Sequence, residues 1–118
     1  MINRKVITKE QALNAIATGE FGDEVRASKA KVVVIMTQDW CPQWRSLSSW
    51  VYGIDTREDV DVYELVYNKV DYSREFMGFK ESVWRNDQIP YLRYYENGSL
   101  TKESNYVSQD RLKEILNI

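Results

Sequence analysis

The sequence predicts an α/β layered domain, and three observations carry this prediction. The run KVVVIMT at residues 31–37 is a continuous apolar, β-branched stretch, typical of a strand that is covered on both faces. Segments with helical spacing of apolar residues alternate with strand-like segments along the chain. Asn97–Gly98 joins two extended segments and is a strong signal for a β-hairpin. With 118 residues the chain has the length of one domain, and we expect residues 1–118 to form it.

The N-terminal part of the chain is expected to alternate between strand and helix. Val6–Ile7 is a candidate for a short strand. Thr8, with Gln11 three residues later, predicts a capping box that opens a helix. Gly19 and Gly22 interrupt this helix, and the segment after them can form one or two further helical turns before the buried strand.

The alternation continues to the C-terminus. Pro42 suits the first position of a helix whose cap lies near Cys41, and Gly53 is expected to bend or end this helix. The other expected elements are a strand around Tyr63–Val70, a helix over residues 73–85 interrupted by Gly78, a hairpin over residues 91–103, and a helix over residues 109–118 capped by Ser108.

Composition argues against several classes of partner. The net charge of −2, with both signs mixed along the chain, gives no electrostatic reason to expect a nucleic acid or an anionic membrane. The longest uninterrupted apolar run, residues 32–36, is far too short to span a bilayer, and no secretory signal is visible at the N-terminus. The single cysteine cannot form an internal disulfide and fits a reducing compartment, so we expect a cytoplasmic protein.

Metal and cofactor chemistry is not expected either. The chain has no histidine and one cysteine, which makes a zinc, copper or haem site improbable and a Ser/His/Asp triad impossible. The acidic residues Asp55, Glu58, Asp59 and Asp61 lack the spacing of a calcium loop and are expected at a solvated helix end.

The segment DWCPQW, residues 39–44, is the strongest candidate for a functional site. It places the only cysteine, Cys41, between Trp40 and Trp44, directly after the buried strand and before a proline. Redox motifs of this shape carry a second cysteine three positions after the first, and here that position is Trp44. The segment therefore raises the question of whether Cys41 acts alone.

Four segments, taken together and in order, resemble thioredoxin. VVVIMTQDWC is similar to the strand and active-site start of that family, KVD at residues 69–71 to the end of its next strand, QIPYLRYYENG to its cis-proline segment and hairpin, and SQDRLKEIL to its C-terminal helix. The resemblance covers nearly the whole chain, with a few extra residues between Asp71 and Pro90. It implies a thioredoxin-like fold, with a central mixed β-sheet flanked by helices on both faces.

The departures from the family pattern fall on the chemistry of its second cysteine. In thioredoxins the first cysteine attacks a substrate disulfide, and the second then displaces the substrate. Trp44 stands in place of that second cysteine, Ile35 in place of the buried aspartate that handles its proton, and Tyr67 near the place of the lysine paired with that aspartate. A dithiol reductase mechanism is therefore excluded.

The half of the site that makes a mixed disulfide is retained. Cys41 is the candidate catalytic residue, because the partial positive charge at a helix start favours a thiolate. By resemblance, Pro90 is expected to be cis and to lie against the thiol, which leaves the backbone of Ile89 free to bind an extended peptide. The candidate substrate-binding residues are Trp40, Pro42, Trp44, Ile89 and Pro90.

Two functions remain open at this point, as does the question of whether the protein is an enzyme. The first is a monothiol redox role, in which Cys41 forms a mixed disulfide with a protein client or with glutathione. The Cys-Pro order is similar to that of glutaredoxins, although their glutathione-binding motifs are missing here. The second is a redox-inactive binding module that docks a peptide at the same surface. For Trp44 there is also an alternative to substrate binding: it can simply fill the space beneath the helix.

Overall fold

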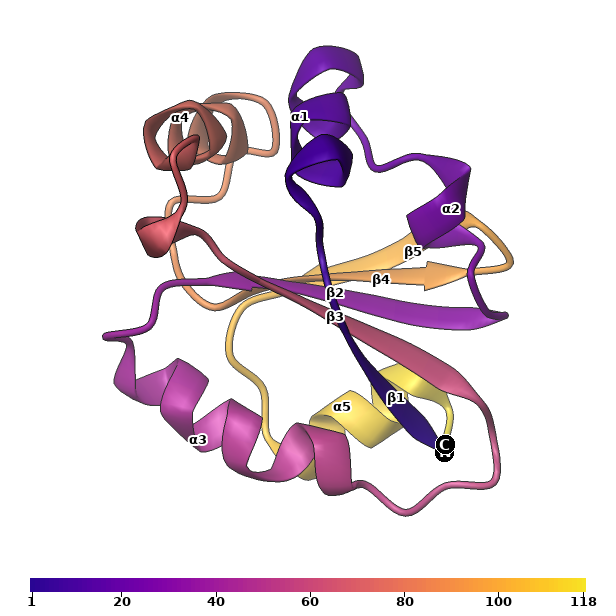
Figure 1. Cartoon of the computed structure of the whole chain (residues 1–118). Helices are drawn as coiled ribbons and strands as arrows, with labels where there is room; N and C mark the ends of the chain where they lie inside the picture. The colour runs from indigo at the N-terminus through magenta and orange to yellow at the C-terminus, as the bar shows by residue number, and fades with distance from the viewer.

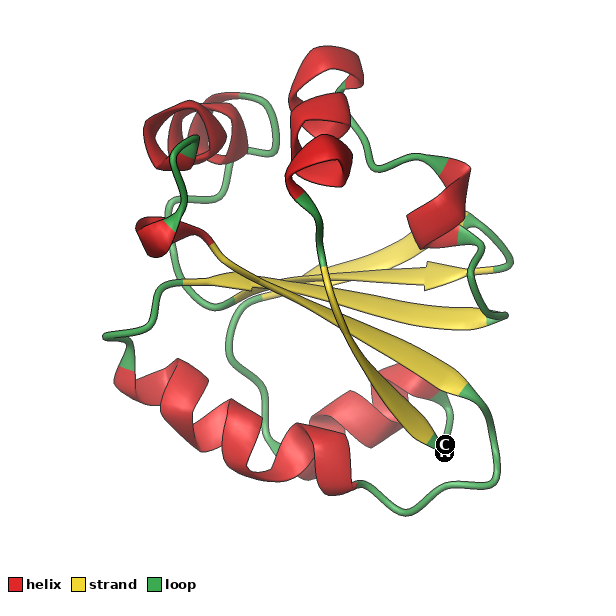
Figure 2. Cartoon of the chain, viewed as in Figure 1, coloured by secondary structure: helices red, strands yellow, loops and turns green.

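The computed structural model describes residues 1–118, and its centre is a five-stranded mixed sheet in the order β1-β3-β2-β4-β5. Strands β1, β3 and β2 are parallel to one another, whereas β4 is antiparallel to β2 and β5 is antiparallel to β4. Figure 2 shows the strands and the helices around them. The elements are β1 (Ile2–Val6), α1 (Lys9–Thr18), α2 (Asp23–Arg26), β2 (Lys31–Thr37), α3 (Pro42–Trp50), η1 (Val51–Gly53), β3 (Val60–Val66), η2 (Tyr67–Lys69), α4 (Ser73–Ser82), β4 (Tyr91–Glu96), β5 (Ser99–Ser104) and α5 (Gln109–Leu116).

Helices cover both faces of the sheet, as the sequence predicts. Helices α1, α2 and α4 lie over one face and α3 and α5 over the other (Figure 1). The alternation along β2 shows why both faces need cover: Val34 belongs to the apolar cluster under α1 and α4, and Ile35 belongs to the cluster under α3 and α5. Both side chains are fully buried. The fold class is therefore α/β, with the sheet as the middle layer.

Local signals set the helix ends that the sequence predicts. The Thr8 side chain accepts a hydrogen bond from the Gln11 amide at 3.1 Å, and the Gln11 side chain accepts one from the Thr8 amide at 2.9 Å, which completes the capping box. Gly19 ends α1 in the left-handed conformation, with φ 92°. Ser108 caps α5 by accepting a hydrogen bond from the Arg111 amide.

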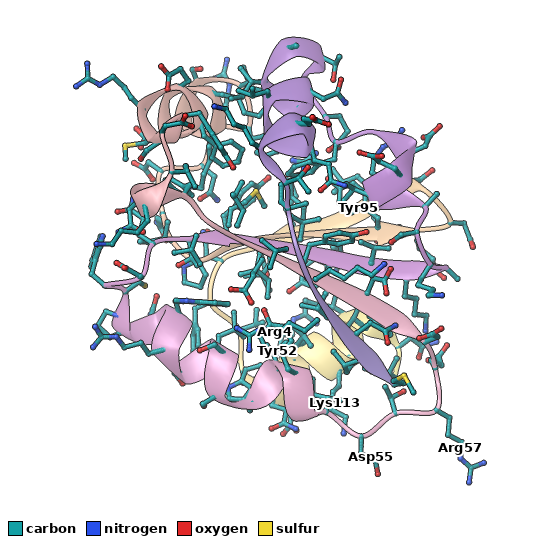
Figure 3. The ribbon with its side chains drawn as sticks, viewed as in Figure 1. Arg4, Tyr52, Asp55, Arg57, Tyr95 and Lys113 are labelled. Carbon is teal, nitrogen blue, oxygen red and sulfur yellow. The ribbon has the colours of Figure 1, made fainter.

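The first strand differs from the sequence expectation. It spans Ile2–Val6, where the sequence indicated only Val6–Ile7. The strand lacks an apolar pattern because it lies at the edge of the sheet, where its polar side chains Asn3, Arg4 and Lys5 bond to acidic residues. Arg4 illustrates this: its guanidinium lies 4.3 Å from the ring centre of Tyr52 and bonds to Glu64 at 2.7 Å. Figure 3 shows Arg4 and Tyr52 side by side below the sheet.

Two other boundaries also differ. Strand β3 ends at Val66, and residues expected to continue it form the 3₁₀ turn η2 instead. Helix α4 runs without a break through Gly78 and ends at Ser82, because a glycine in an exposed helical position weakens a helix without stopping it. Trp84 consequently lies outside the helix, in the irregular segment that leads to β4.

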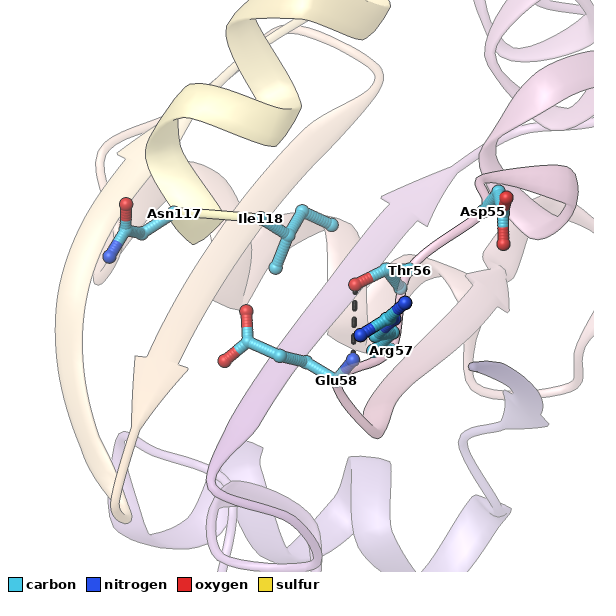
Figure 4. A pocket seen from close by; sticks show the side chains of 6 residues that line it. All are labelled: Asp55, Thr56, Arg57, Glu58, Asn117 and Ile118. Carbon is cyan, nitrogen blue, oxygen red and sulfur yellow. Dashed lines mark hydrogen bonds between the residues drawn. The ribbon is translucent and has the colours of Figure 1, made fainter.

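The acidic residues before and within β3 are not all solvated, contrary to expectation. Asp61 is fully buried on β3, where it accepts a hydrogen bond from Asn3 at 3.0 Å and lies 3.1 Å from the ammonium group of Lys5. Asp55 and Glu58 lie instead on the loop before the strand, where the Glu58 amide donates to the Thr56 hydroxyl at 3.2 Å (Figure 4). Six residues of this loop and of the C-terminus line an open polar pocket: Asp55, Thr56, Arg57, Glu58, Asn117 and Ile118.

The structure brings no group of three or more His, Cys, Asp or Glu side chains together in a way that could hold a metal ion. None of its helices combines the length and the apolar character needed to cross a membrane.

A buried arginine connects β4 to the rest of the domain on the sheet face that α1 and α4 cover. The Arg93 side chain, 5% exposed, bonds to Glu20 at 2.5 Å and to the hydroxyl of Tyr95 at 2.9 Å, and its guanidinium lies 4.2 Å from the ring centre of Trp84. Tyr91 and Tyr95 share this face of β4, whereas Leu92 and Tyr94 point to the other, as strand alternation predicts.

We expect the Glu20→Gln substitution to destabilise the fold by about 1–3 kcal/mol, because it removes the charged acceptor of a buried arginine. Equilibrium unfolding in urea, followed by circular dichroism, measures this change. The matched control is Glu103→Gln, since Glu103 is 3.5 Å from Arg93 and half-exposed, and we expect it to cost no more than about 1 kcal/mol. Equal losses in the two variants would contradict this account of Arg93.

Candidate functional site

Cys41 lies at the junction of β2 and α3. It is the N-cap residue of α3, and its carbonyl accepts the first helical hydrogen bond, from Arg45, at 3.1 Å. Pro42 follows at the first helical position, where its missing N–H costs nothing. The Cys41 side chain does not cap the helix. The sulfur is therefore free to face another segment.

That segment is Gln88–Ile89–Pro90, which we name the docking segment. The Cys41 sulfur donates to the Ile89 carbonyl oxygen at 3.8 Å, and the peptide bond between Ile89 and Pro90 is cis. The sequence-based expectation of a cis bond at this position is thus met, and the thiol lies against the peptide group that precedes the proline. Cys41 is only 4% exposed, so the sulfur is close to the surface but largely covered.

The loop before Cys41 is fixed by an asparagine that sequence reasoning missed. Asn68 accepts a hydrogen bond from the Asp39 amide at 3.0 Å, and its own amide group donates to the Asp39 carboxylate at 2.7 Å. Asn68 lies in η2, which was expected to be strand, so no sequence pattern predicted this contact. Trp40, next in the loop, is 58% exposed, and its indole N–H donates to Gln38 at 2.6 Å. The indole ring is thereby presented to solvent beside the thiol.

The docking segment is fixed from its other side by polar side chains. Asn105, between β5 and α5, donates to the Pro90 carbonyl at 3.1 Å and to the Asn86 side chain at the same distance. Lys80, near the end of α4, donates to the Gln88 carbonyl at 2.7 Å. The Ile89 amide has no partner within the chain.

Trp44, Ile35 and Tyr67 stand at the positions of the second cysteine and of the aspartate and lysine that assist it, and they make this region apolar. Trp44 is 7% exposed and packs in one cluster with Cys41, Leu47 and Ile35. Tyr67 lies in the other cluster, with its ring centre 5.3 Å from that of Phe76, and burial is the main cause that raises the pKa of its hydroxyl. No thiol, carboxylate or ammonium group occupies these three positions. The structure therefore brings no group to Cys41 that could resolve a mixed disulfide from within.

The predicted site residues divide into two groups. Cys41, Ile89 and Pro90 meet at one place, with Trp40 and Pro42 exposed beside them. Trp44 instead is buried beneath α3, in agreement with the alternative hypothesis that it fills the space under this helix. Neither of the two pockets in the structure includes any of these residues. The region around Cys41, which we name the Cys41 face, is consequently a surface with one exposed tryptophan rather than a cavity for a small ligand.

Solved structures of thioredoxins share this arrangement of strands and helices. Thioredoxin O1 from Arabidopsis thaliana, in its oxidised state, is 17% identical, with a TM-score of 0.68, and the match covers 97% of this chain and 95% of that one. The chain has a thioredoxin-like fold. A mutant thioredoxin from Halobacterium salinarum NRC-1 matches over 98% of this chain and 88% of its own, with 15% identity and a TM-score of 0.66.

The short form of thioredoxin F from spinach chloroplast matches at 14% identity and a TM-score of 0.66, over 97% of this chain and 90% of its own. No protein-family model matches the chain, and neither does any curated protein sequence. At these identities the comparisons establish the fold, and the chemistry of the Cys41 face has to be argued from its own residues.

The two tryptophans that flank Cys41 are expected to respond differently to truncation. Trp44→Ala should destabilise the fold by about 3–5 kcal/mol, because it leaves a cavity in the cluster beneath α3. Trp40→Ala is the matched control and should change stability by no more than about 0.5 kcal/mol, since its ring faces solvent. Urea unfolding followed by circular dichroism, which does not rely on tryptophan fluorescence, measures both. A loss at Trp40 equal to that at Trp44 would overturn the assignment of the two roles.

Proposed function

We propose that this thioredoxin-like protein uses Cys41 as a single thiol that forms a mixed disulfide with a protein client docked on the Cys41 face. The observation that carries the proposal is the position of the sulfur, 3.8 Å from the Ile89 carbonyl oxygen. A client strand that pairs with the docking segment brings its own sulfur to the same place.

The docking step rests on backbone groups and one aromatic side chain. The Ile89 amide lacks a partner, so it can donate to a carbonyl of an extended client segment, as in strand addition. Trp40 offers a rigid aromatic surface at the edge of the same area, and tryptophan is common at the energetic centre of interfaces. Because the Cys41 face has no pocket, an extended peptide suits it better than glutathione as the first partner.

The covalent step is thiol–disulfide exchange. The Cys41 thiolate attacks one sulfur of a client disulfide, that S–S bond breaks, and the second client sulfur leaves as a thiolate and takes up a proton. No second thiol exists in the chain, so an external thiol such as glutathione has to attack the Cys41 sulfur of the mixed disulfide. The client sulfur then leaves as a thiolate and takes up a proton, and Cys41 stays joined to the external thiol by a disulfide. A second external thiol then releases Cys41, and the client disulfide is reduced as two external thiols are oxidised to a disulfide.

The first test is the reaction of the folded protein with a peptide that carries an activated disulfide. We expect one covalent adduct per chain by mass spectrometry, at Cys41, and none in Cys41→Ser. We also expect no reduction of insulin at thioredoxin-like rates, because the resolving thiol is missing. A folded wild-type protein whose thiol stays unmodified, or rapid insulin reduction, would each contradict the proposal.

A second function is favoured by the low exposure of Cys41. At 4% exposure, within the same cluster as Trp44 and Leu47, the cysteine fits equally the role of a small apolar side chain in a binding module without redox chemistry. In that case a client binds Cys41→Ser as well as it binds the wild type, Trp40→Ala weakens binding, and no adduct forms. The covalent test above therefore separates the two functions.

The location and other partners belong to the same proposal. A chain with one cysteine and a net charge of −2 fits a cytoplasmic protein that acts on other proteins rather than on nucleic acids or membranes.

A further inference from the structure

Lys80 is a buried charged residue that neither the sequence analysis nor the proposed chemistry uses. Its side chain is fully enclosed, with the residue 1% exposed, near the end of α4. Lysine is rarely buried to this extent, because removing its ammonium group from water is costly unless hydrogen bonds replace the water. The structure supplies those bonds from one short segment.

All three acceptors of the Lys80 ammonium group belong to the loop that leads into β4. The group donates to the Asn86 carbonyl at 2.8 Å, to the Asn86 side-chain oxygen at 3.4 Å and to the Gln88 carbonyl at 2.7 Å. An ammonium group has three N–H donors, so its capacity is filled. The two carbonyls lie on either side of Asp87, and a single ammonium group therefore holds both ends of this turn.

This loop has no regular structure of its own. Residues 83–90 form no helix or strand, and Arg85 adopts a left-handed backbone conformation with φ 55°. Within the loop, the Asn86 side chain accepts a hydrogen bond from the Gln88 amide at 3.1 Å. Without the Lys80 side chain, the backbone before Pro90 would keep this local bond, the bond from the Asn86 amide to the carbonyl of residue 80 at 3.3 Å, the contact of the Ile89 carbonyl with the Cys41 thiol and the contacts of Asn105. None of these bonds holds the Gln88 carbonyl.

Asn105 completes the support from the opposite side. Its amide group donates to the Pro90 carbonyl and to the Asn86 side chain, and its oxygen accepts from Asn86 at 3.2 Å. Asn86 is thus the common partner of Lys80 and Asn105. The three side chains together fix the direction in which the unpaired Ile89 amide points.

We propose that Lys80 is a positioning residue that holds the docking segment in the geometry required to bind an extended client peptide. The inference rests on the proposed function for its consequence in client binding, but the positioning itself is a property of the fold. Lys80 does not contact the client. It acts through the carbonyls of Asn86 and Gln88, which set the path of the chain into the Ile89–Pro90 peptide.

The charges around Lys80 bear on how it can be tested. Burial lowers the pKa of Lys80 to about 8, while Glu81 on its own helix and Asp87 on the loop oppose that shift. On β4 the ring of Tyr91 lies 5.5 Å from the ammonium group, and the Tyr91 hydroxyl in turn contacts Arg93 and Glu103. Burial raises the pKa of Tyr91 well above its usual value, so this tyrosine stays neutral while Lys80 titrates.

The first experiment reads the two carbonyls directly. In the Cys41→Ser protein, we expect the carbonyl ¹³C signals of Asn86 and Gln88 to shift together with a midpoint near the Lys80 pKa of about 8. The same signals in Lys80→Met should show no such step. A titration step that persists in Lys80→Met would overturn the role given to Lys80. Carbonyl signals that do not move when Lys80 is retained would overturn it as well.

The second experiment measures the consequence for docking. The probes are an extended peptide with an activated disulfide and 2,2′-dithiodipyridine, a small disulfide that needs no strand pairing. We expect Lys80→Met to lower the rate of Cys41 modification by the peptide about tenfold relative to the rate with the small disulfide. The reason is that a displaced docking segment no longer aligns the peptide disulfide with the Cys41 sulfur. Lys80→Arg, which retains charge and donors, should recover most of the rate.

Matched variants keep the outcome interpretable. Lys102→Met, at an exposed lysine on β5 that forms no ion pair, should leave both rates unchanged. If Lys80→Met fails to fold, Asn105→Ala tests the same support from the other side and should lower the same ratio of rates. An unchanged ratio in a folded Lys80→Met protein overturns the proposal. A wild-type cysteine that reacts with neither probe contradicts the proposed redox function instead, and the carbonyl titration still decides the role of Lys80.

Discussion

Strand β2 pairs with β3 on one side and β4 on the other, and both of its faces are buried. Its residues 32–37 are fully excluded from solvent, so a slip of one residue along its neighbours would exchange the side chains of the two apolar clusters and disrupt the packing on both faces. The position of its last residue, Thr37, is therefore fixed by the whole sheet. Cys41 follows only a few residues later, and β4, which starts just after Pro90, is aligned by the same strand. The meeting of the thiol with the Ile89–Pro90 peptide depends on this double pairing.

Polar side chains add directional hydrogen bonds to the apolar packing of Ile89 and Pro90 and fix the loops at the Cys41 face. Asn68 holds the loop before the cysteine, and Lys80, Asn86 and Asn105 hold the docking segment. This division has a physical reason: loops near the surface expose backbone groups that need hydrogen-bond partners, and a directional bond fixes a carbonyl more sharply than apolar contact does. The sheet sets where the two loops meet, and these side chains set how they meet.

The replacement of the second cysteine is consistent across the site. Trp44 fills space under α3, Ile35 joins the same cluster, and Tyr67 packs on the other face of the sheet. Each of these positions would need a polar partner if it were to serve proton transfer, and each is instead apolar or aromatic. The face that remains includes one sulfur, one exposed indole ring and the unpaired amide of Ile89. In the proposed function these groups hold a client chain, with one covalent bond through the sulfur.

The sequence by itself determined the layered α/β fold, because a both-faces-buried strand such as residues 31–37, a capping box at Thr8 and an Asn-Gly hairpin are local signals with direct physical meaning. It also indicated Cys41, Ile89 and Pro90 as candidate site residues, through the order in which its segments resemble those of thioredoxin. It did not reveal the full extent of β1, whose stability comes from pairing with β3 rather than from an apolar pattern, or the turn η2. Nor could it find Lys80, Asn68 and Asn105, since an isolated lysine or asparagine in a sequence reads as a surface residue. Only the tertiary structure decided that these three are supports, because their partners are backbone and side-chain groups of other segments that folding alone brings within hydrogen-bond distance.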